Sequence, residues 1–531
     1  MRKRADGKGV DLLLVDTGDR VEGNGLYDAS EPKGVFTYDI YHQQDVDIIC
    51  TGNHELYQYA TAAAEHKYTV PNFKGKYIAS NLDYIDPDTS KISPMAQRYR
   101  KFKTQNQGIE VLAFGFLFDF TGNANNTVVI PVERTVKEEW FQKAIREKPD
   151  IFVVIGHVGL RMEELKMIHE EIRKANWNAP IAIFAGHAHV RDAKPFDSRA
   201  FGMASGRYLE TIGWMSVDGI KPEGQGATAA PSFTRKYLDN NLYGFHHHAG
   251  LNSTSFPTEE GMSVSTQIRK ARHALNLDYR FGCAPKDLWM FRAPYPSSES
   301  IYSWLVTEVL PGVAIKKGRE TKPRLAIFNS GGIRFDIFKG AFTRDSTYIV
   351  SPFVSKLHHI PDVPYYIARK VITLLNIGGP IFDAAGFDPR YMAVPEAWSG
   401  VEHVVAKSEE DDSDRRLELR TLNPQYPLGD DTVLTQGYTT IDDVGKDGDD
   451  TVHEPMLHYR PPNCVQSKIA FTDEEPDTVD LVFIDFITPW ILLALRFAGA
   501  DYTKADISAY RDETFTHLMA DWIKEHWAQG C

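Results

Sequence analysis

Four short segments of the chain place a metal-binding side chain directly after a glycine. They are Gly18-Asp19, Gly52-Asn53-His54-Glu55, Gly156-His157 and Gly186-His187-Ala188-His189. One segment of this kind is typical of an ordinary turn or helix N-cap, and a lone histidine there usually makes only a structural hydrogen bond. Four of them in one region instead indicate a shared metal site.

The residue types suit the hydrolysis of a phosphate ester. That reaction needs a nucleophilic hydroxide near neutral pH and cations that screen the phosphoryl oxygens, and two metal ions about 3.5–4 Å apart can provide both. The Asp19 carboxylate can bridge two ions, while imidazoles and a carboxamide complete their shells. His54 can contact the phosphate or protonate the leaving oxygen. We expect Glu55 to hold the His54 ring from behind.

The elements that must position these residues alternate between apolar strands and amphipathic helices. Such alternation predicts a layered α/β domain, in which ligand sites gather at the carboxyl ends of strands. The expected helices are Thr135–Glu147 and Met162–Ala175, and shorter β-like runs follow over Phe201–Val217. The expected strands are Leu12–Asp16, Val46–Cys50, Tyr77–Ser80, Val111–Phe116, Ile151–Ile155 and Ile181–Phe184.

Composition narrows the class of protein. A chain of 531 residues is long enough for two or more domains. The formal net charge of -13 argues against a nucleic-acid-binding surface. No apolar stretch reaches the length of a membrane span, since Leu481–Ala498 is interrupted by Asp485, Pro489 and Arg496. The composition is therefore that of an ordinary globular protein.

The pattern divides the chain into four parts. We expect a first domain over 1–239, a linker over 240–264, a second α/β domain over 265–470 and an extension over 471–531. The linker is polar with little periodicity, and His246-His247-His248 within it is interpreted as a solvated run rather than a metal site. The charged stretch 406–416 is expected to be a solvated loop.

The later parts carry their own expected elements. A helix is predicted at Ile301–Val309 and a strand at Leu325–Phe328. Leu481–Phe486 reads as a buried strand or helix, and an aromatic-rich helix is expected near the C-terminus.

The four metal motifs resemble those of the calcineurin-like metallophosphoesterases in order and approximate spacing, with Gly18-Asp19 extended to Gly23. The resemblance implies a four-layer α/β/β/α domain with two divalent ions, which could be Zn, Mn, Co or Fe. It implies that Asp19 bridges the ions and that His54 contacts the phosphate. By the same resemblance one ion is completed by Asn53, His157 and His187, and the other is served by His189.

A fifth family motif is missing. The family opens with an Asp-x-His that supplies two ligands to the ion served by His189, and no Asp-x-His precedes Asp19 here. Asp16 does not fit the motif, so this ion would keep only Asp19 and His189. The sequence favours a shortened gene model or fragment. The alternative is a binding or scaffold protein whose metal site has decayed.

A glycine-rich turn in the second domain could bind substrate. Asn329-Ser330-Gly331-Gly332-Ile333-Arg334 follows the strand Leu325–Phe328, and Arg334 can present its planar guanidinium to a phosphate. Together with the first domain it resembles the C-terminal domain of the 5'-nucleotidase family, which carries an Asn-x-Gly-Gly-Ile-Arg motif. The resemblance implies an α/β fold and assigns substrate binding to Asn329, Arg334, Phe353 and Asp447, with Arg292 as a further phosphate-side candidate.

This sequence departs from that family at two places that concern binding of the nucleotide base. Its second stacking aromatic falls at Ile441, which offers apolar contact but no π-stacking. The loop around Asp447 is also more acidic, with Asp449 and Asp450. We therefore expect lower affinity for the base or a different substrate.

The expected function is metal-dependent hydrolysis of phosphate monoesters, above all nucleoside 5'-phosphates, in a cleft between the two domains. The alternatives are the scaffold protein with a decayed metal site and a phosphodiesterase or protein phosphatase of the same superfamily. Because the superfamily site serves all these reactions, only the second domain argues for nucleotides, and it does so by analogy. The partner is a small phosphate ester or nucleotide.

Cysteines and flanking signals bear on the compartment. The chain resembles fungal phosphoesterases of the 5'-nucleotidase group, which implies the secretory pathway, vacuole or extracellular space. A disulfide between Cys283 and Cys464 is possible there, and Asn125 and Asn252 begin glycosylation sequons. No signal-peptide-like segment follows Met1, so the cytoplasm is the alternative.

Overall fold

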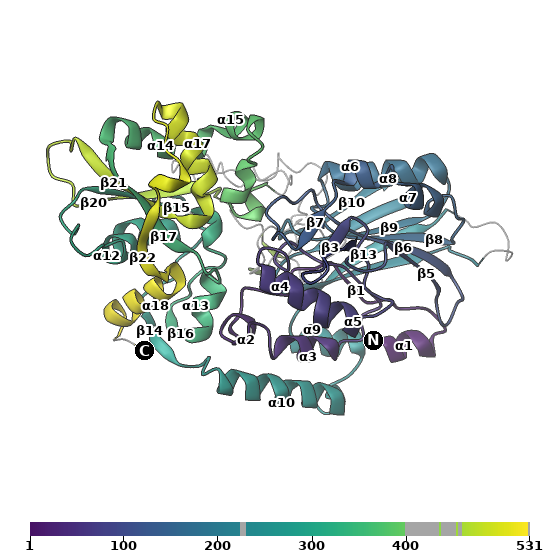
Figure 1. Cartoon of the computed structure of the whole chain (residues 1–531). Helices are drawn as coiled ribbons and strands as arrows, with labels where there is room; N and C mark the ends of the chain where they lie inside the picture. Colours follow the sequence, from purple (N-terminus) through teal and green to yellow (C-terminus); the bar gives the residue numbers. More distant parts are fainter. Residues whose placement is uncertain (223–229, 399–434, 437–452, 455–458, 529–530) are drawn as a thin grey trace.

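The computed structural model describes residues 1–222, 230–398, 435–436, 453–454, 459–528 and 531. The chain forms two α/β bodies joined by the helix α10 (Glu259–Ala274), which runs along one side of both (Figure 1). The expected loop 406–416 and the positions Ile441 and Asp447 lie outside the described residues. Across the described ranges, no helix combines the length and apolar character needed to cross a membrane.

A six-stranded sheet forms the centre of the first domain, in the order β10-β11-β9-β8-β6-β5. Its middle strands β6, β8 and β9 run parallel. All seven residues of β8 are buried, as expected for a parallel strand covered on both faces. The strands are β5 (Tyr99–Lys103), β6 (Glu110–Leu117), β8 (Ile151–His157), β9 (Ile181–Ala185), β10 (Arg191–Asp197) and β11 (Ala200–Ser205).

Three helices cover one face of this sheet: α6 (Val132–Thr135), α7 (Glu139–Ala144) and α8 (Glu163–Ala175). The residues that α8 buries toward the sheet, Leu165, Ile168 and Ile172, are spaced as on one helical face. The prediction of one helix over Thr135–Glu147 is wrong, because the backbone at Glu138 is extended and separates α6 from α7.

A second sheet layer covers the other face. It contains the short parallel pair β1 (Val15–Asp16) and β2 (Ile48–Ile49) and the hairpin β12 (Thr211–Asp218)–β13 (Ser232–Asp239). Residues such as Cys50 and Val153 fill the core between the two sheet layers. Of the six expected strands, Tyr77–Ser80 is wrong, since it makes only single bridges to Ile49 and Gln97.

Short helices form the outermost layer of the first domain. Beyond β2, the helices α3 (Thr37–His42) and α5 (Val70–Asn72) flank a small apolar cluster that includes Ile49, Phe73 and Tyr77. The order of layers is therefore helix, sheet, sheet, helix. The expected four-layer α/β/β/α fold is confirmed.

The second domain is built on a five-stranded sheet in the order β20-β15-β21-β17-β22. Its strands are β15 (Arg324–Asn329), β17 (Lys356–Pro364), β20 (Cys464–Ile469), β21 (Thr478–Ile484) and β22 (Ser508–Thr514). The central strand β21 comes from the segment 471–531, which was expected as an extension. We therefore propose that the second domain continues to residue 531.

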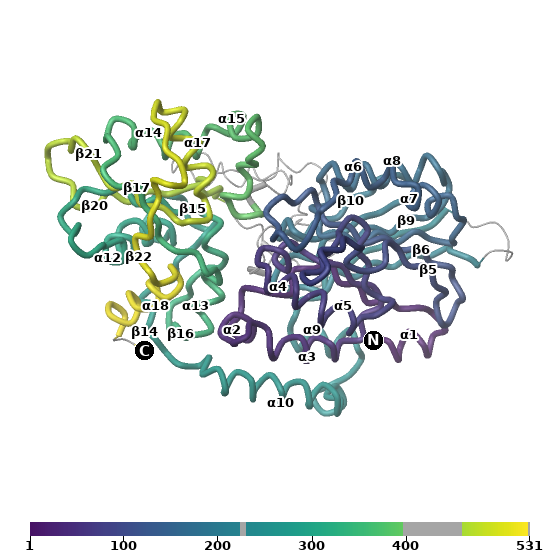
Figure 2. Tube along the Cα trace, viewed as in Figure 1, coloured from purple at the N-terminus to yellow at the C-terminus, as the bar shows by residue number. Residues whose placement is uncertain are grey.

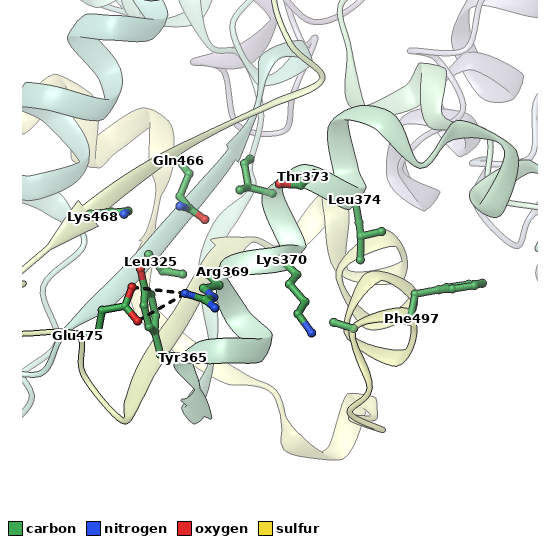
Figure 3. A pocket seen from close by; sticks show the side chains of 12 residues that line it. Leu325, Tyr365, Arg369, Lys370, Thr373, Leu374, Gln466, Lys468, Glu475 and Phe497 are labelled. Carbon is green, nitrogen blue, oxygen red and sulfur yellow. Dashed lines mark hydrogen bonds and ion pairs between the residues drawn. The ribbon is translucent and has the colours of Figure 1, made fainter.

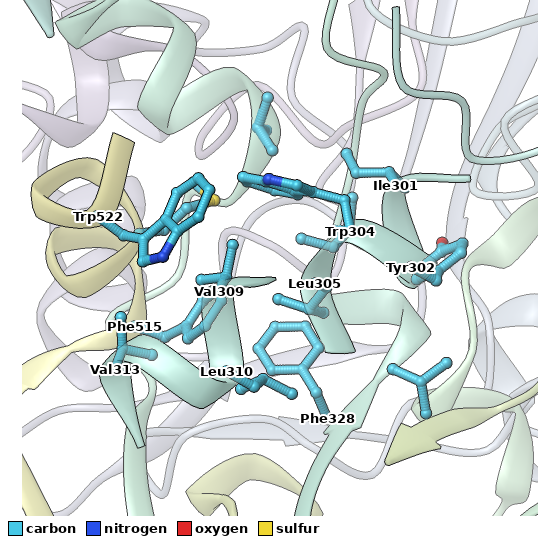
Figure 4. Packing of buried hydrophobic residues seen from close by; sticks show 14 of the residues in the cluster. Ile301, Tyr302, Trp304, Leu305, Val309, Leu310, Val313, Phe328, Phe515 and Trp522 are labelled. Atoms are coloured by element: carbon cyan, nitrogen blue, oxygen red, sulfur yellow. The ribbon is translucent and has the colours of Figure 1, made fainter. Parts of the chain in front are cut away.

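An aromatic core packs one face of this sheet. Figure 4 shows Trp304 and Tyr302 from α11 (Ile301–Trp304) directed toward the same core as Phe328 of β15. The Phe328 and Phe515 ring centroids lie 4.4 Å apart, and those of Trp304 and Trp522 lie 5.6 Å apart. Phe515 and Trp522 belong to α18 (Phe515–His526), which confirms the expected aromatic C-terminal helix.

The linker expected over 240–264 contains helical structure, and the three histidines lie in a helix and not in a loop. This stretch contains α9 (Leu242–Ala249), which includes the three adjacent histidines, and the start of α10 (Figure 2). The Asn241 and Thr258 side chains accept hydrogen bonds from backbone N–H groups at the starts of these helices. Such caps stabilise a helix even where its sequence shows little apolar periodicity. The periodicity is weak in α10 because this helix buries only Ala271.

One disulfide joins Cys283 of β14 (Arg280–Ala284) to Cys531, with Cα atoms 5.6 Å apart. The suggested Cys283–Cys464 pairing is therefore wrong. Cys464 is a buried free thiol whose Sγ lies 3.9 Å from Met392 Sδ. Spacing alone could not decide the pairing, because connectivity is set by the fold.

The disulfide predicts a thiol count. Denatured, unreduced protein should show two free thiols, Cys50 and Cys464, and four after reduction. Cys464→Ala should leave one free thiol and an intact bridge. Cys531→Ser should leave Cys283 as a third free thiol. It should also lower the free energy of unfolding by about 2–4 kcal/mol, because the bridge restricts the unfolded chain. Thiol titration with thermal unfolding measures both, and loss of the bridge in Cys464→Ala would contradict the pairing.

Candidate active site between the two domains

Two glycines allow β1 and β2 to bring their following loops together. A Cβ atom on Gly18 would lie 2.3 Å from the Gly52 nitrogen, and one on Gly52 would lie 2.1 Å from Asp19 Oδ1. Gly18 also has φ of +92°. Only glycine fits these positions, because any side chain would meet backbone or the Asp19 carboxylate.

Three predicted metal ligands have left-handed backbone. The φ angles of Asp19, His187 and His189 are +61°, +69° and +60°. Such conformations are unfavourable for residues other than glycine and persist only where the surroundings enforce them. The strain therefore gathers where the sequence predicts metal ligands.

Two of the predicted metal ligands, His157 and Asn53, each have a buried acceptor atom without a hydrogen-bond partner. His157 Nδ1 lies 2.9 Å from the Thr17 carbonyl, to which it donates, so Nε2 keeps its lone pair. Nε2 lies 2.9 Å from Asp19 Oδ2 but has no hydrogen-bond partner, and neither does Asn53 Oδ1. The Asn53 amide nitrogen donates to Tyr57 OH, which fixes the direction of Oδ1. Unpartnered buried acceptors at contact distance suit a bound cation.

The two histidines of the last motif lie at the edges of this spot. The His187 ring stacks on Phe118 at 4.1 Å and lies 5.2 Å from the His157 ring. Burial lowers the pKa of His187 well below its ordinary value and that of His189 to about 4. Both rings are therefore neutral near neutral pH, which metal ligation requires. His189 Nδ1 lies 3.3 Å from Glu396 Oε1 of the second domain.

The donor set fits one metal ion better than two. Within the described part of the chain, no three His, Cys, Asp or Glu side chains are close enough to hold an ion as they stand. Asp19 and His157 nevertheless lie 2.9 Å apart, with the His187 ring beside His157, and Asn53 lies in the chain between Gly52 and His54, which both approach Asp19. For a second ion the first domain presents Asp19 and His189.

Glu55 does not hold the His54 ring, which corrects the expectation. Its carboxylate is fully buried and accepts hydrogen bonds from the backbone nitrogens of Gly52, Arg20 and Asp19, at 2.7, 2.6 and 3.1 Å. Glu55 therefore joins the loops after β1 and β2 and fixes the backbone around Asp19.

His54 contacts a different carboxylate and an arginine of the other domain. Its Nδ1 lies 2.7 Å from Glu22 Oε2, and its Nε2 lies 3.2 Å from Arg334 Nη2. Burial would lower the pKa of His54, but the Asp19 and Glu22 carboxylates outweigh it and raise that pKa above its ordinary value. Sequence reasoning missed Glu22, whose only signal is an acidic residue between Asp19 and Gly23.

The glycine-rich turn of the second domain positions Arg334. The Asn329 amide donates to the Met392 carbonyl at 3.1 Å, and a Cβ on Gly331 would lie 2.7 Å from the Ala393 carbonyl oxygen. The motif thus packs against the segment 392–393. Asn329 supports the turn from behind, and Arg334 is the member that reaches the first domain.

The remaining substrate-binding candidates differ in placement. The Phe353 ring is stacked toward His54 with centroids 6.2 Å apart, and the Arg334 guanidinium lies 5.7 Å from the Phe353 centroid. The Arg292 guanidinium lies over the Trp289 ring at 4.8 Å. The structure therefore brings Arg334 and Phe353 to His54, and Asp447 lies outside the described residues.

Further contacts hold the two domains together around this site. Arg207 of the first domain donates to Glu396 and to the Arg334 carbonyl, and Tyr208 OH donates to that carbonyl at 2.9 Å. Glu396 is fully buried, and no sequence motif marked it or Arg207. The backbone that carries Arg334 is thus attached directly to the first domain.

A separate hollow of about 740 Å³ lies on the second domain (Figure 3). Tyr365, Arg369, Lys370, Gln466 and Lys468 help to line it, and Arg369 is paired there with Glu475. It contains none of the predicted site residues. We place the candidate active site at His54 because the motif residues of both domains converge there.

Comparisons with known proteins match both domains. Residues 2–191 match the family model described as calcineurin-like phosphoesterase, and residues 287–492 match the one described as NAD nucleotidase, C-terminal domain. An uncharacterized protein of Schizosaccharomyces pombe is 35% identical, covering 100% of this chain and 86% of the relative. A protein of Arthroderma benhamiae named "Secreted protein" is 34% identical, covering 100% and 85%.

Solved structures are similar to the chain over nearly its whole length. The 5'-nucleotidase from Candida albicans is 34% identical, covers 99% of this chain and 91% of its own, and superposes with a TM-score of 0.84. A 5'-nucleotidase precursor from Thermus thermophilus shares the fold, with a TM-score of 0.58 at 15% identity, over 100% of this chain and 90% of its own. This chain belongs to the calcineurin-like phosphoesterases of the 5'-nucleotidase family, with a phosphoesterase domain followed by a 5'-nucleotidase C-terminal domain.

Proposed function

We propose that this protein hydrolyses phosphate monoesters, above all nucleoside 5'-phosphates, at the site between its domains in a metal-dependent reaction. One observation carries the proposal. Arg334 Nη2 lies 3.2 Å from His54 Nε2, although the residues are 280 positions apart and belong to different domains. A phosphate-binding cation and a proton-transfer group therefore meet at one point, beside the unpartnered acceptors of His157 and Asn53.

The first domain would hold the metal. Asp19, Asn53, His157 and His187 are the residues that fit an ion, with His189 at the edge of a second position. A divalent ion bound there would activate water and screen the charge of the phosphoryl oxygens. Its identity, Zn, Mn, Co or Fe, is left open by ligands of this mixed nitrogen and oxygen type.

The side chains around the ion would bind the substrate and protonate the leaving oxygen. Arg334 presents a guanidinium that can bind two phosphate oxygens. His54 Nε2 accepts from Arg334 in the resting chain. Once phosphate lies between them, Nε2 would take up a proton, which the raised pKa of His54 favours, and would donate it to the leaving oxygen. Phe353 lies beside both groups and is placed to stack on a base.

One observation favours a second candidate. His189 Nδ1 lies 3.3 Å from Glu396 Oε1 of the second domain, and among the described residues of the first domain the motifs offer a second ion Asp19 and His189. A protein that binds nucleotides without hydrolysing them would fit this arrangement. Metal content separates the enzyme from the binding protein. Bound metal together with turnover supports the enzyme, and the absence of bound metal supports the binding protein.

We also propose that the protein enters the secretory pathway. The Cys283–Cys531 disulfide suits an oxidising compartment. The sequon asparagines Asn125 and Asn252 are exposed, and one relative is named "Secreted protein".

The main test is phosphate release. The protein should release phosphate from AMP, UMP or p-nitrophenyl phosphate when Mn²⁺, Co²⁺ or Zn²⁺ is added, and a chelator should abolish the release because water activation needs the ion. Free phosphate measures the outcome, with heat-denatured protein plus metal as the control. No metal-dependent release from any of the three substrates would refute the proposed function.

Two substitutions should have different effects on bound metal. Asp19→Asn removes the carboxylate that faces His157, so bound metal per protein should fall along with activity. His54→Ala should lower kcat by about 10²-fold or more with bound metal unchanged, because it removes only the proton donor. Elemental analysis beside kinetics separates them. Metal lost from His54→Ala would overturn the role given to His54.

Arg334→Lys should weaken substrate binding. Lysine keeps the charge but loses the planar pair of donors, so KM for AMP should rise by about 10-fold or more while bound metal stays constant. The matched control is Arg369→Lys in the separate hollow, which should leave KM unchanged. Steady-state kinetics decide the matter, and equal effects at the two positions would argue against a role for Arg334 in the site.

A further inference from the structure

The two groups that are proposed to bind phosphate contact each other directly. Arg334 Nη2 lies 3.2 Å from His54 Nε2. One phosphate oxygen that accepted hydrogen bonds from both nitrogens at about 2.8 Å would hold them about 4 Å apart or more. A phosphate group therefore cannot lie between these side chains in the described arrangement. The structure describes a site from which phosphate is excluded.

A carboxylate of the second domain reaches into the same site. Glu396 belongs to the short 3₁₀ helix Pro395–Trp398 and is fully buried. Its Oε1 lies 3.3 Å from His189 Nδ1 and accepts a hydrogen bond from Arg207. Arg207 also donates to the carbonyl of Arg334, at 3.3 Å. Glu396 is thus next to a predicted metal ligand and next to the arginine that holds the backbone of Arg334.

Glu396 is charged in spite of its burial. Burial would raise the pKa of this carboxyl group, but Arg207 and His189, together with Arg334, outweigh the burial and hold the pKa below its usual range. The charge is also useful to its main partner. Arg207 is buried, and a buried guanidinium without an anion beside it is unfavourable. In the site without substrate, Glu396 supplies that anion.

A role in joining the domains does not by itself explain why this carboxylate lies in the site. The domains are joined by another carboxylate as well, since Asp345 of the second domain accepts from the Gly25 nitrogen of the first at 2.8 Å and pairs with Arg272. None of those three residues is a predicted site residue. Glu396, by contrast, contacts His189 of the last metal motif.

We propose that Glu396 is an internal anion that occupies the phosphate side of the site when substrate is absent, and that phosphate must displace it in order to bind. The proposal rests on the proposed function. A phosphate group and a carboxylate are both anions that accept hydrogen bonds from guanidinium groups, so they compete for the same arginines. Two anions held side by side repel each other, and the binding of one therefore requires the other to withdraw.

Such competition affects both ends of the reaction. It lowers the affinity of the site for the phosphate group of the substrate. It lowers the affinity for inorganic phosphate as well, because the product carries the same charged group. Glu396 would therefore help to release the product, and its loss should make phosphate a stronger inhibitor.

The experiment measures the binding of inorganic phosphate by isothermal titration calorimetry, in proteins with equal bound metal. Glu396→Gln keeps the size of the side chain and removes its charge, so the Kd for phosphate should fall by about 10-fold or more. KM for AMP should fall with it. The matched control is Asp345→Asn, which removes a charge between the domains but outside the predicted site residues, and which should leave the Kd unchanged.

Two results of this titration would overturn the proposal. One is an unchanged or higher Kd for phosphate in Glu396→Gln. The other is an equal fall of the Kd in Asp345→Asn, because weaker contact between the domains would then explain the gain. If AMP is hydrolysed, these results affect only the role of Glu396. If wild type and Glu396→Gln neither bind phosphate nor hydrolyse AMP, the proposed function fails too.

A second measurement needs no variant. In a crystal structure of the wild-type protein with inorganic phosphate bound, the Glu396 carboxylate should have left His189 Nδ1 and Arg207, and Arg334 should have separated from His54. This measurement also decides the matter if Glu396→Gln does not fold. Phosphate bound at Arg334 with Glu396 still in contact with Arg207 and His189 would refute the displacement.

Discussion

The site depends on the close approach of the two backbone segments that follow β1 and β2. The absence of side chains at Gly18 and Gly52 permits it, and the buried Glu55 carboxylate holds it by accepting three backbone N–H groups from both segments. That approach turns Asp19 into a left-handed conformation and aims its carboxylate at His157. Three charge-assisted hydrogen bonds inside the protein are strong enough to sustain such strain.

An ion pair and hydrogen bonds attach the second-domain half of the site to the first domain. Arg207 donates to Glu396 and to the carbonyl of Arg334, so the segment that carries Arg334 is fixed from the opposite domain. Both charged groups are buried, and a buried pair is tolerated only when each group is well partnered. The arrangement of the two domains is therefore specified in part by particular polar contacts.

Local patterns in the sequence predicted that the glycine motifs lie at strand ends, and they do lie at the ends of β1, β2, β8 and β9, while metal binding by these motifs stays a prediction. The same reasoning assigned Glu55 to His54 and was wrong, since neighbours in sequence need not point the same way. Glu22 and Glu396 act through contacts 32 and 207 residues away, which no local pattern contains. The disulfide partner of Cys283 and the capped helix α9 were missed for related reasons. The domain boundaries and the role of Asp447 stay predictions.

The position of β15 in its sheet has a consequence for how the protein reaches its working form. β15 is flanked by β20 and β21, both of which lie more than a hundred residues later in the chain. The strand that leads into the turn with Arg334 therefore has neither of its neighbouring strands to pair with until those later strands have been made. Pairings between such distant segments form slowly, because a long loop must close first. During synthesis the first-domain half of the candidate site can therefore fold well before Arg334 reaches its place, so a site that needs both halves would be completed last.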